Sequence, residues 1–405
     1  MGAVNHAGTL EFRYDASGRL IEERSAVAGG TLALAHTYDE MGNRVRTTLP
    51  DGRNLNWLHY GSGHLHQINV DGDVIADMER DALHREVART QGLLESRFHY
   101  DRRGRLASQH VRRSSPMPGV REGQAVPVSR FGQHDVQADG FAVPSIARNY
   151  QYDQAGNPLA VHDARFGKTI YAYDAIGRLR QANDERFAFD PASNILDATP
   201  QPVSAPGKVA EAPSWPVDSD DRLHPFDVPP DPPAVAHAVV DNRVRFYDGQ
   251  RCVYDAHGNL IERRIGQHVV MRFDYDPLHR MTSAEVTRQG VTQRYRYLYD
   301  AMNRRVGKCD VFGMTRFVWD ADRLLAETRG QRTRVYVYGE APYVPVAQIE
   351  SRVLNGQLSS SLFHYHVDHI GTPREMTDHD GQLVWRAGGI RSWSRTRKRC
   401  LAASP

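Results

Sequence analysis

The sequence contains 405 residues, of which 40% are hydrophobic and 25% charged, and its formal net charge is +2. A charge so close to balance creates no field over the whole chain that would attract nucleic acid or an anionic membrane. Cys252, Cys309 and Cys400 show no CxxC spacing, which argues against a disulfide framework and a structural zinc site. The first residues lack a charged segment followed by an apolar core, and no apolar run is long enough to cross a bilayer. We therefore expect neither a secretory signal peptide nor a transmembrane segment.

One short phrase recurs along the sequence. It reads YDASGRL at Tyr14, YDRRGRL at Tyr100, YDAIGRL at Tyr173 and YDAHGNL at Tyr254, with spacers of variable length. A fixed phrase with variable spacers is typical of a repeat architecture. In a type I turn, Asp at the first position accepts hydrogen bonds from backbone N–H groups, and Gly at the fourth adopts positive φ without strain. Each copy therefore predicts one β-hairpin with a G1-type bulge, in which the aromatic residue faces the aliphatic residue after the turn.

The residues expected to form these turns are the aromatic residue, the Asp and, where it is present, the Gly of each copy. They are Tyr14, Asp15, Gly18, Tyr38, Asp39, Gly42, Tyr100, Asp101, Gly104, Tyr152, Asp153, Gly156, Tyr173, Asp174, Gly177, Tyr254, Asp255, Gly258, Tyr299 and Asp300. Looser copies begin at Phe189, Tyr275 and Trp319. Where His279 or Asn303 replaces the glycine, we expect slight strain, which Asn tolerates better than most residues.

The phrase and its interruptions divide the chain into seven segments. These are 1–110, 149–197 and 241–350 with hairpins; 111–148, an irregular insert or degraded hairpins; 198–240, a Pro-rich insert or loop; 351–388, a terminal segment containing HVDHIGTP; and 389–405, a divergent basic tail. Residues 198–240 are rich in Pro, Ala and Asp, which predicts a linker, an external loop or a disordered insertion.

The predicted fold class is all-β, with consecutive antiparallel hairpins that form a curved or spiralling sheet. Apolar and polar residues alternate between the turns, as they do in half-buried strands. Neighbouring strands twist by roughly 20–25°, and the apolar face of a sheet has to be covered. A long sheet of this kind is expected to curl into a wide wall that encloses space.

A second motif raises the possibility of metal chemistry. Residues 364–369 read HYHVDH, and HxHxDH is the metal-ligand run of metallo-β-lactamase-type hydrolases, in which two zinc ions generate hydroxide. The candidate ligands are His364, His366, Asp368 and His369. Such a site needs further ligands downstream, but only His379 follows, and no βα pattern precedes the run. We therefore favour a structural role for these residues and predict no bound metal.

Other features give little indication of an active site. The sequence contains no GxSxG motif, no P-loop and no Rossmann glycine pattern, and its abundant Tyr-Asp aspartates are explained by the turns. Residues 391–399 read RSWSRTRKR, which could form a patch for nucleic acid or a membrane, although we favour a frayed terminus or a product of truncation. We predict no catalytic residue, no cofactor and no nucleic-acid partner.

Taken together, the motifs resemble the RHS (YD-repeat) family. The turn phrases are followed by FVWDADRLLAE at Phe317, VYVYGEAPYVPVAQIE at Val335 and FHYHVDHIGTPREMTDHDGQLVW at Phe363, in the order of the terminal part of an RHS core. The family motif comprises His366, Asp368, His369, Gly371, Thr372 and Pro373. The resemblance implies a β-shell of a bacterial polymorphic toxin, which encloses a C-terminal effector and leaves the cytoplasm through a specialised route such as type VI secretion.

This sequence departs from the family after Arg386. It reads AGGIRSWSRTRKRCLAASP, without the DPxG segment that performs self-cleavage in bacterial members and without an effector domain. We therefore expect a non-catalytic fragment of the shell, whose partners are an effector and the missing shell segments. A secretion spike or an immunity protein would be reached through the effector. The alternative is a cell-surface adhesion or carbohydrate-binding protein, suggested by Tyr, Trp and Arg residues on alternating strands.

Overall fold

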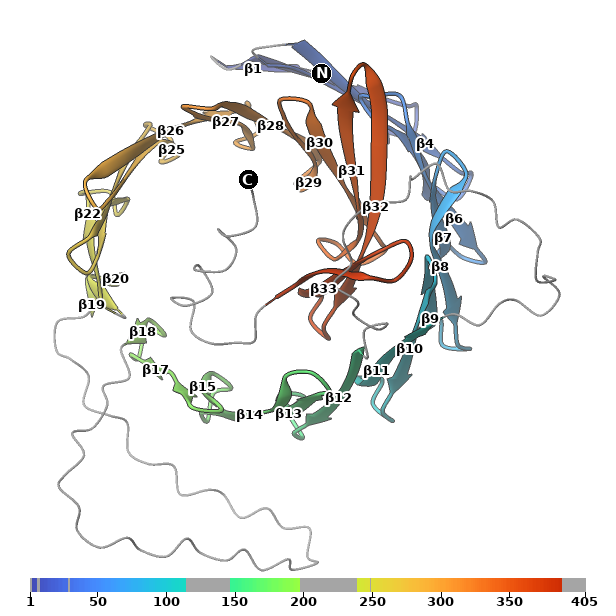
Figure 1. Ribbon diagram of the computed structural model, residues 1–405, viewed down its shortest axis with the longest axis horizontal. Helices are drawn as coiled ribbons and strands as arrows, with labels where there is room; N and C mark the ends of the chain where they lie inside the picture. Colours follow the sequence, from blue (N-terminus) through green and yellow to red (C-terminus); the bar gives the residue numbers. More distant parts are fainter. Residues whose placement is uncertain are drawn as a thin grey trace, which may run out of the picture. The chain divides into compact units, whose positions relative to one another are not determined.

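The structure is a computed structural model that describes residues 2–5, 8–27, 30–113, 146–196, 239–247 and 249–387. Over these ranges the chain forms antiparallel β-strands joined by turns and contains no helix (Figure 1). The prediction of an all-β fold of consecutive antiparallel hairpins is confirmed. No helix in the described ranges is long and apolar enough to span a membrane.

The first sheet contains 16 described strands, each paired with its neighbour in sequence. They are β1 (Gly2–Asn5), β2 (Gly8–Tyr14), β3 (Leu20–Val27), β4 (Gly30–Tyr38), β5 (Arg44–Thr48), β6 (Asn54–Tyr60), β7 (His64–Val70), β8 (Asp73–Arg80), β9 (Glu86–Gln91), β10 (Leu94–Tyr100), β11 (Leu106–Arg113), β12 (Ile146–Tyr152), β13 (Pro158–Asp163), β14 (Gly167–Tyr173), β15 (Leu179–Ala182) and β16 (Glu185–Arg186).

A second sheet contains 14 described strands in the same sequential order. They are β21 (Phe246–Tyr247), β22 (Gln250–Tyr254), β23 (Leu260–Ile265), β24 (Val269–Tyr275), β25 (Met281–Arg288), β26 (Val291–Tyr299), β27 (Arg305–Asp310), β28 (Gly313–Asp320), β29 (Arg323–Arg329), β30 (Arg332–Tyr338), β31 (Pro345–Leu354), β32 (Gln357–Val367), β33 (Pro373–Asp378) and β34 (Leu383–Arg386). Two short pairs join β17 (Ala188–Phe189) to β18 (Ile195–Leu196) and β19 (Val239–Val240) to β20 (Arg243–Val244).

The predicted inserts and tail lie largely outside the described residues. Within segment 111–148, only residues 111–113 and 146–148 are described, and they belong to β11 and β12. Within segment 198–240, only residues 239 and 240 are described, and they form β19. The tail 389–405 is not described.

The chain divides into two compact units. The first comprises Met1–Thr169, Asp274–Ala284 and Gln293–Pro405, and the second comprises Ile170–Phe273 and Glu285–Thr292. Within the second unit, the turn at Asp190 is joined to the start of β20 by a hydrogen bond from Asn194 to Asn242 (2.6 Å).

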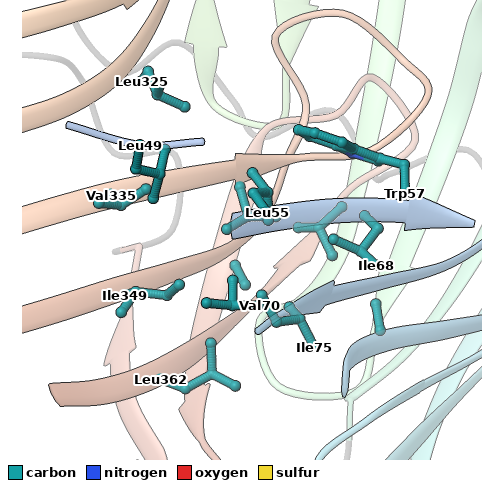
Figure 2. Close-up of a cluster of buried hydrophobic side chains, with 14 of the residues drawn as sticks. Leu49, Leu55, Trp57, Ile68, Val70, Ile75, Leu325, Val335, Ile349 and Leu362 are labelled. Carbon is teal, nitrogen blue, oxygen red and sulfur yellow. The ribbon is translucent and has the colours of Figure 1, made fainter. Parts of the chain in front are cut away.

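The apolar core of the first unit forms between two runs of strands that are distant in sequence. In Figure 2, Leu55, Ile68 and Ile75 from β6–β8 lie against Val335 and Ile349 from β30 and β31. Each of these five side chains is at most 2% exposed. Full burial of such a side chain contributes about 1.5–3 kcal/mol. Because side chains alternate between the two faces of a strand, one face of each run enters this core and the other remains free for polar residues.

Polar contacts extend the same packing along both runs. Asn5 donates to the carbonyl of Tyr299 (2.7 Å), and Gln91 donates to the carbonyl of Val346 (2.9 Å). Ion pairs join Arg44 to Asp320 and Arg80 to Glu340, each at 2.7 Å. Strands of the second sheet therefore pack onto strands of the first sheet through hydrogen bonds and ion pairs as well as apolar contacts.

Replacing Gly258 tests how far the turns depend on positive φ. Gly258 has φ +90°, and a Cβ atom built there would come no closer than 3.7 Å to the Arg243 side chain. The cost of Gly258→Val therefore arises from the backbone, and we expect a loss of about 1–2 kcal/mol in unfolding free energy from urea melts.

The matched control is Gly258→Asn, since Asn303 occupies the corresponding turn position at φ 62°. We expect this variant to lose less than about 1 kcal/mol, because Asn tolerates the left-handed region. Equal stability of the Val variant and the unaltered protein would contradict the assignment.

Candidate functional site

The recurring turn is organised by its Asp carboxylate. At Asp255, Oδ1 accepts the backbone N–H groups of His257 (2.9 Å) and Asn259 (2.8 Å), while Oδ2 accepts the Asn259 side-chain amide (2.7 Å). Two backbone hydrogen bonds close the loop, from Asp255 to Asn259 (3.0 Å) and from Gly258 to Asp255 (3.2 Å). The strand register shifts between Val253 and Tyr254, so that Tyr254 lies opposite Leu260. This is the geometry of a type I turn followed by a bulge.

The same pair of backbone hydrogen bonds occurs throughout the described chain. It is found at Asp15, Asp39, Asp81, Asp101, Asp153, Asp174, Asp190, Asp276, Asp300, Asp368 and Asp378. His279 and Asn303, which replace the glycine, adopt φ 59° and 62°. Hydrogen bonding also shifts the titration of a turn carboxylate: the backbone N–H of Arg105, followed by its guanidinium, lowers the pKa of Asp101.

The residue four positions after the Asp connects one turn to the next. Arg105 binds Asp101 through Nε (2.7 Å) and donates through a terminal nitrogen to the carbonyl of Asp153 in the following YD turn (3.0 Å). Its guanidinium lies over the Tyr152 ring, 4.6 Å from the centroid, and the Tyr152 hydroxyl donates to the carbonyl of Leu106 (2.9 Å). One arginine thus joins two turns through an ion pair, a hydrogen bond and a cation–π contact.

We call this arrangement the turn ladder. Other arginines that cover an aromatic ring of the next turn are Arg19 over Tyr38, Arg85 over Tyr100, Arg178 over Phe189, Arg280 over Tyr299 and Arg323 over Tyr338. Sequence analysis placed the aromatic and Asp residues in turns but gave no role to these arginines. The signal was present as Arg in the GRL ending of several copies, but its partner lies on another hairpin.

The HVDHIGTP segment contains another copy of the turn. Asp368 Oδ1 accepts the N–H groups of Ile370 (3.2 Å) and Thr372 (3.0 Å), and Gly371 donates to the Asp368 carbonyl (3.0 Å). Gly371 has φ +83°, and a Cβ atom there would lie 2.4 Å from a methyl group of Val344. Pro373 begins β33 directly after the turn. Asp368 is therefore engaged by the turn, and Gly371 is required both for its φ and for close packing.

A buried polar cluster lies where the β32–β33 hairpin meets β11–β13. We define it as Gln109, Arg148, Asp163, His366, Glu375 and Thr377, all of which are buried. Arg148 donates to Asp163 (2.8 Å) and Gln109 (3.1 Å), which lie directly opposite it on the two neighbouring strands, and also to Glu375. Arg148 is 1% exposed and Glu375 is 0% exposed. Burial raises the pKa of Glu375, while the charge of Arg148 opposes that shift.

The four candidate metal ligands are divided between a strand and a turn. His364 and His366 project from the same face of β32, and His366 Nε2 lies 3.0 Å from the Thr377 hydroxyl. Asp368 is in the turn, and His369 packs on Tyr150 with ring centroids 4.9 Å apart. Burial lowers the pKa of both His364 and His366 to about 3, so both are neutral at pH 7. Among the described residues, no three His, Cys, Asp or Glu side chains are grouped so as to hold a metal ion.

Consecutive antiparallel hairpins closed by aromatic-Asp turns define a YD-type β-repeat protein. The family model described as RHS Repeat matches residues 14–53, and the model described as RHS protein matches residues 362–398. The chain belongs to the RHS family.

Two bacterial toxins are similar over nearly the whole chain. Double-stranded DNA deaminase toxin A of Burkholderia cenocepacia is 32% identical over 412 residues, covering 95% of this chain and 25% of the toxin. Toxin protein Tse5 of Pseudomonas aeruginosa is 28% identical over 425 residues, covering 93% of this chain and 30% of that protein. The chain thus spans only about a quarter to a third of the length of these relatives.

Solved structures share the fold. A chain of the Photorhabdus luminescens Tc holotoxin pore matches with a TM-score of 0.51 at 14% identity, covering 94% of this chain and 19% of that one. A crystal structure of TcdB2–TccC3 without its hypervariable C-terminal region matches with a TM-score of 0.54 at 14% identity, covering 94% of this chain and 20% of that one. At this level of identity the likeness concerns the fold alone.

Removing one arginine tests the turn ladder. Arg105→Ala abolishes the bond to Asp101, the bond to the Asp153 carbonyl and the contact with Tyr152. We expect a loss of about 1–2 kcal/mol in urea melts, since each contact contributes of the order of 0.5–1 kcal/mol. Arg102→Ala in the same turn is the control and should change stability by less than about 0.5 kcal/mol. Equal effects of the two substitutions would show that the ladder contributes nothing.

A second substitution tests the buried polar cluster. Arg148→Met leaves Asp163 and Glu375 without their buried counter-charge, and we expect a loss of about 3–5 kcal/mol at pH 7. Combining it with Glu375→Met should recover part of this loss, because one uncompensated carboxylate is then removed. Arg24→Ala, which breaks an ion pair of a half-exposed arginine with Glu22, should cost less than about 1 kcal/mol. A loss that small for Arg148→Met would contradict the assigned role of the cluster.

Proposed function

We propose that this chain is a non-catalytic segment of the wall of an RHS shell, which encloses and helps to deliver a C-terminal toxin effector in bacterial competition. The observation that carries the proposal is the run of linked Asp-centred hairpins. Since several hairpins are joined to the next through the turn ladder, the repeat supports an extended β-wall. Membership of the RHS family and the two similar toxins support the same role.

The hydrogen bonds and the burial of the polar residues also support a structural role. The turn carboxylates accept backbone N–H groups and, in most turns, the side chain of Arg or Asn, so their hydrogen-bonding capacity serves the fold. Two residues of the HxHxDH run, His364 and His366, are buried in the first unit, where a substrate would not reach them. We assign no catalytic residue and no cofactor to the chain.

The partners of such a segment are the remaining parts of the shell and the effector. A secretion spike and an immunity protein would bind the complete toxin. The toxin would leave the bacterial cytoplasm through a specialised secretion system. The relatives are three to four times as long as the matched stretch, which leaves length for the rest of a shell and its contents.

An exchange of segments tests enclosure. In the Burkholderia cenocepacia toxin, the stretch of 412 matched residues is replaced by this chain, and the purified protein is treated with thermolysin. The readout is the double-stranded DNA deaminase activity that survives the treatment. We expect the chimera to protect this activity as the unaltered toxin does, because the wall remains continuous.

The control is the toxin with the matched stretch deleted, whose deaminase activity should be rapidly lost to the protease. A chimera that loses its activity as fast as the deletion variant would refute the wall role. An intact chimera whose activity survives would also separate this role from simple binding, since protection depends on enclosure.

The second candidate is adhesion or carbohydrate binding. Aromatic residues could stack on sugar rings, but several repeat tyrosines are covered by arginine and donate their hydroxyl groups to backbone carbonyls, as Tyr38 and Tyr152 do. The wall role therefore accounts better for these rings. Specific binding of the isolated chain on a glycan array would favour the second candidate.

A further inference from the structure

Three arginines lie side by side on neighbouring strands of the first unit. Arg329 on β29 is the register partner of Arg332 on β30, and Arg332 is in turn the partner of Arg352 on β31. We call these three residues the arginine row. Each of their side chains is at least 39% exposed, so the row is open to solvent. Like charges directly opposite each other destabilise a sheet, and an anion bound at the row would relieve that repulsion.

The carboxylates of the protein balance the arginine row only in part. Asp310 pairs with Arg329 at 2.7 Å. Glu350 is shared by the other two members of the row and by Arg334. Among the described residues, Nε of Arg332 has no hydrogen-bond partner. The three positive charges of the row thus meet two carboxylates, one of which also serves a fourth arginine, so the row has positive charge left for an acidic ligand.

The strand at the end of the arginine row has a free edge. β31 and β32, with 10 and 11 residues, are longer than β30 and β33, with 7 and 6 (Figure 1). β33 pairs with β32 only as far as Phe363, so among the described strands residues 357–360 pair with β31 alone. Ser359, the register partner of Arg352, lies on this edge. Residues 355–360 contain neither a proline nor a charged residue, which are the usual protection of an edge strand.

Two residues of the free edge turn their backbone groups outward. Val353 donates its N–H to the carbonyl of Gln331 (3.2 Å), which lies on the side of β31 away from β32. Residues that face each other in an antiparallel pair alternate between bonded and non-bonded positions. Leu358, the register partner of Val353, and Ser360 therefore direct their N–H and C=O groups away from β31. Outward groups of this kind are a template for another strand.

We propose that the free edge of β32 and the arginine row together bind an extended acidic polypeptide segment, which joins the sheet as a further strand. Main-chain hydrogen bonds to Leu358 and Ser360 hold the segment. Neighbouring strands lie about 4.8 Å apart, so an acidic residue of the segment faces Arg352 across the short side chain of Ser359.

A polypeptide fits this edge better than another polyanion does. Only a backbone with regularly spaced N–H and C=O groups satisfies the outward groups of a strand, whereas a nucleic acid or an anionic glycan would engage the arginines alone. The proposal does not depend on enclosure of an effector.

Fluorescence anisotropy of labelled peptides mixed with the full chain tests the proposal. The probe is a peptide of four Thr-Glu repeats, whose glutamates all lie on one face of an extended strand. One control peptide has Gln in place of Glu, and another keeps the glutamates but has N-methylated backbone amides. In about 50 mM salt we expect the probe to bind at least about tenfold more tightly than either control, with the advantage over the Gln peptide shrinking as salt is raised.

Substitutions in the chain locate the site. Ser360→Pro removes an outward N–H group and should weaken binding of the probe at least about tenfold. Arg332→Gln combined with Arg352→Gln should abolish the preference for Glu over Gln peptides. The matched control is Arg24→Gln, which alters a half-exposed arginine paired with Glu22 and should bind as the unaltered chain does.

Hydrogen exchange keeps the test decisive if a variant does not fold. In the unaltered chain, saturating probe should slow exchange over residues 357–360, and unchanged exchange there would refute strand addition. Equal binding of the N-methylated peptide, equal competition by an oligothymidylate, or full binding by the double arginine variant would also overturn the proposal. A dimer of the chain that Ser360→Pro abolishes and the probe does not displace would assign the edge to a second copy instead.

Discussion

The Asp-centred turn is the interaction on which the described structure depends. One carboxylate oxygen accepts two backbone N–H groups and closes the hairpin, while the other receives the residue four positions later. When that residue is arginine, as at Arg105, its remaining nitrogens reach the next turn. The turn therefore determines both the conformation of one hairpin and its connection to the following one. Because each link involves only neighbours, copies can be added in series without a change in design.

Packing between distant strands imposes a second constraint. Residues of β6–β8 and β30–β31 share one apolar core, and Arg148 joins β11, β12 and β13 to Glu375 in β33. An apolar face tolerates small shifts, but a buried arginine with two carboxylates requires a definite register. The polar cluster thus places the HVDHIGTP hairpin at one position on the sheet, which is a geometric reason for charged residues in an otherwise costly location.

The HVDHIGTP segment has a structural role in this fold. Asp368 forms the turn, Gly371 supplies positive φ beside Val344, and His366 lies in the buried cluster. The side chains of the HxHxDH run therefore lie in three different surroundings: a turn, one face of a strand and a contact with an aromatic ring. A metal site requires side chains that converge on one point, and the turn after β32 takes Asp368 and His369 away from the strand face that carries His364 and His366.

The sequence by itself determined the all-β class, the family and the places where the chain turns, because Asp-x-x-Gly turn chemistry acts within five residues and can be read from one short phrase. It also indicated, through alternation, that each strand has one buried face. Tertiary structure decided which strands meet: the partners of Arg105, Arg148 and His366 lie 48, 227 and 11 residues away. No local pattern encodes such pairings, since they depend on how successive hairpins twist and on which faces come together to exclude water. The burial that makes His364 and His366 neutral arises only from that packing.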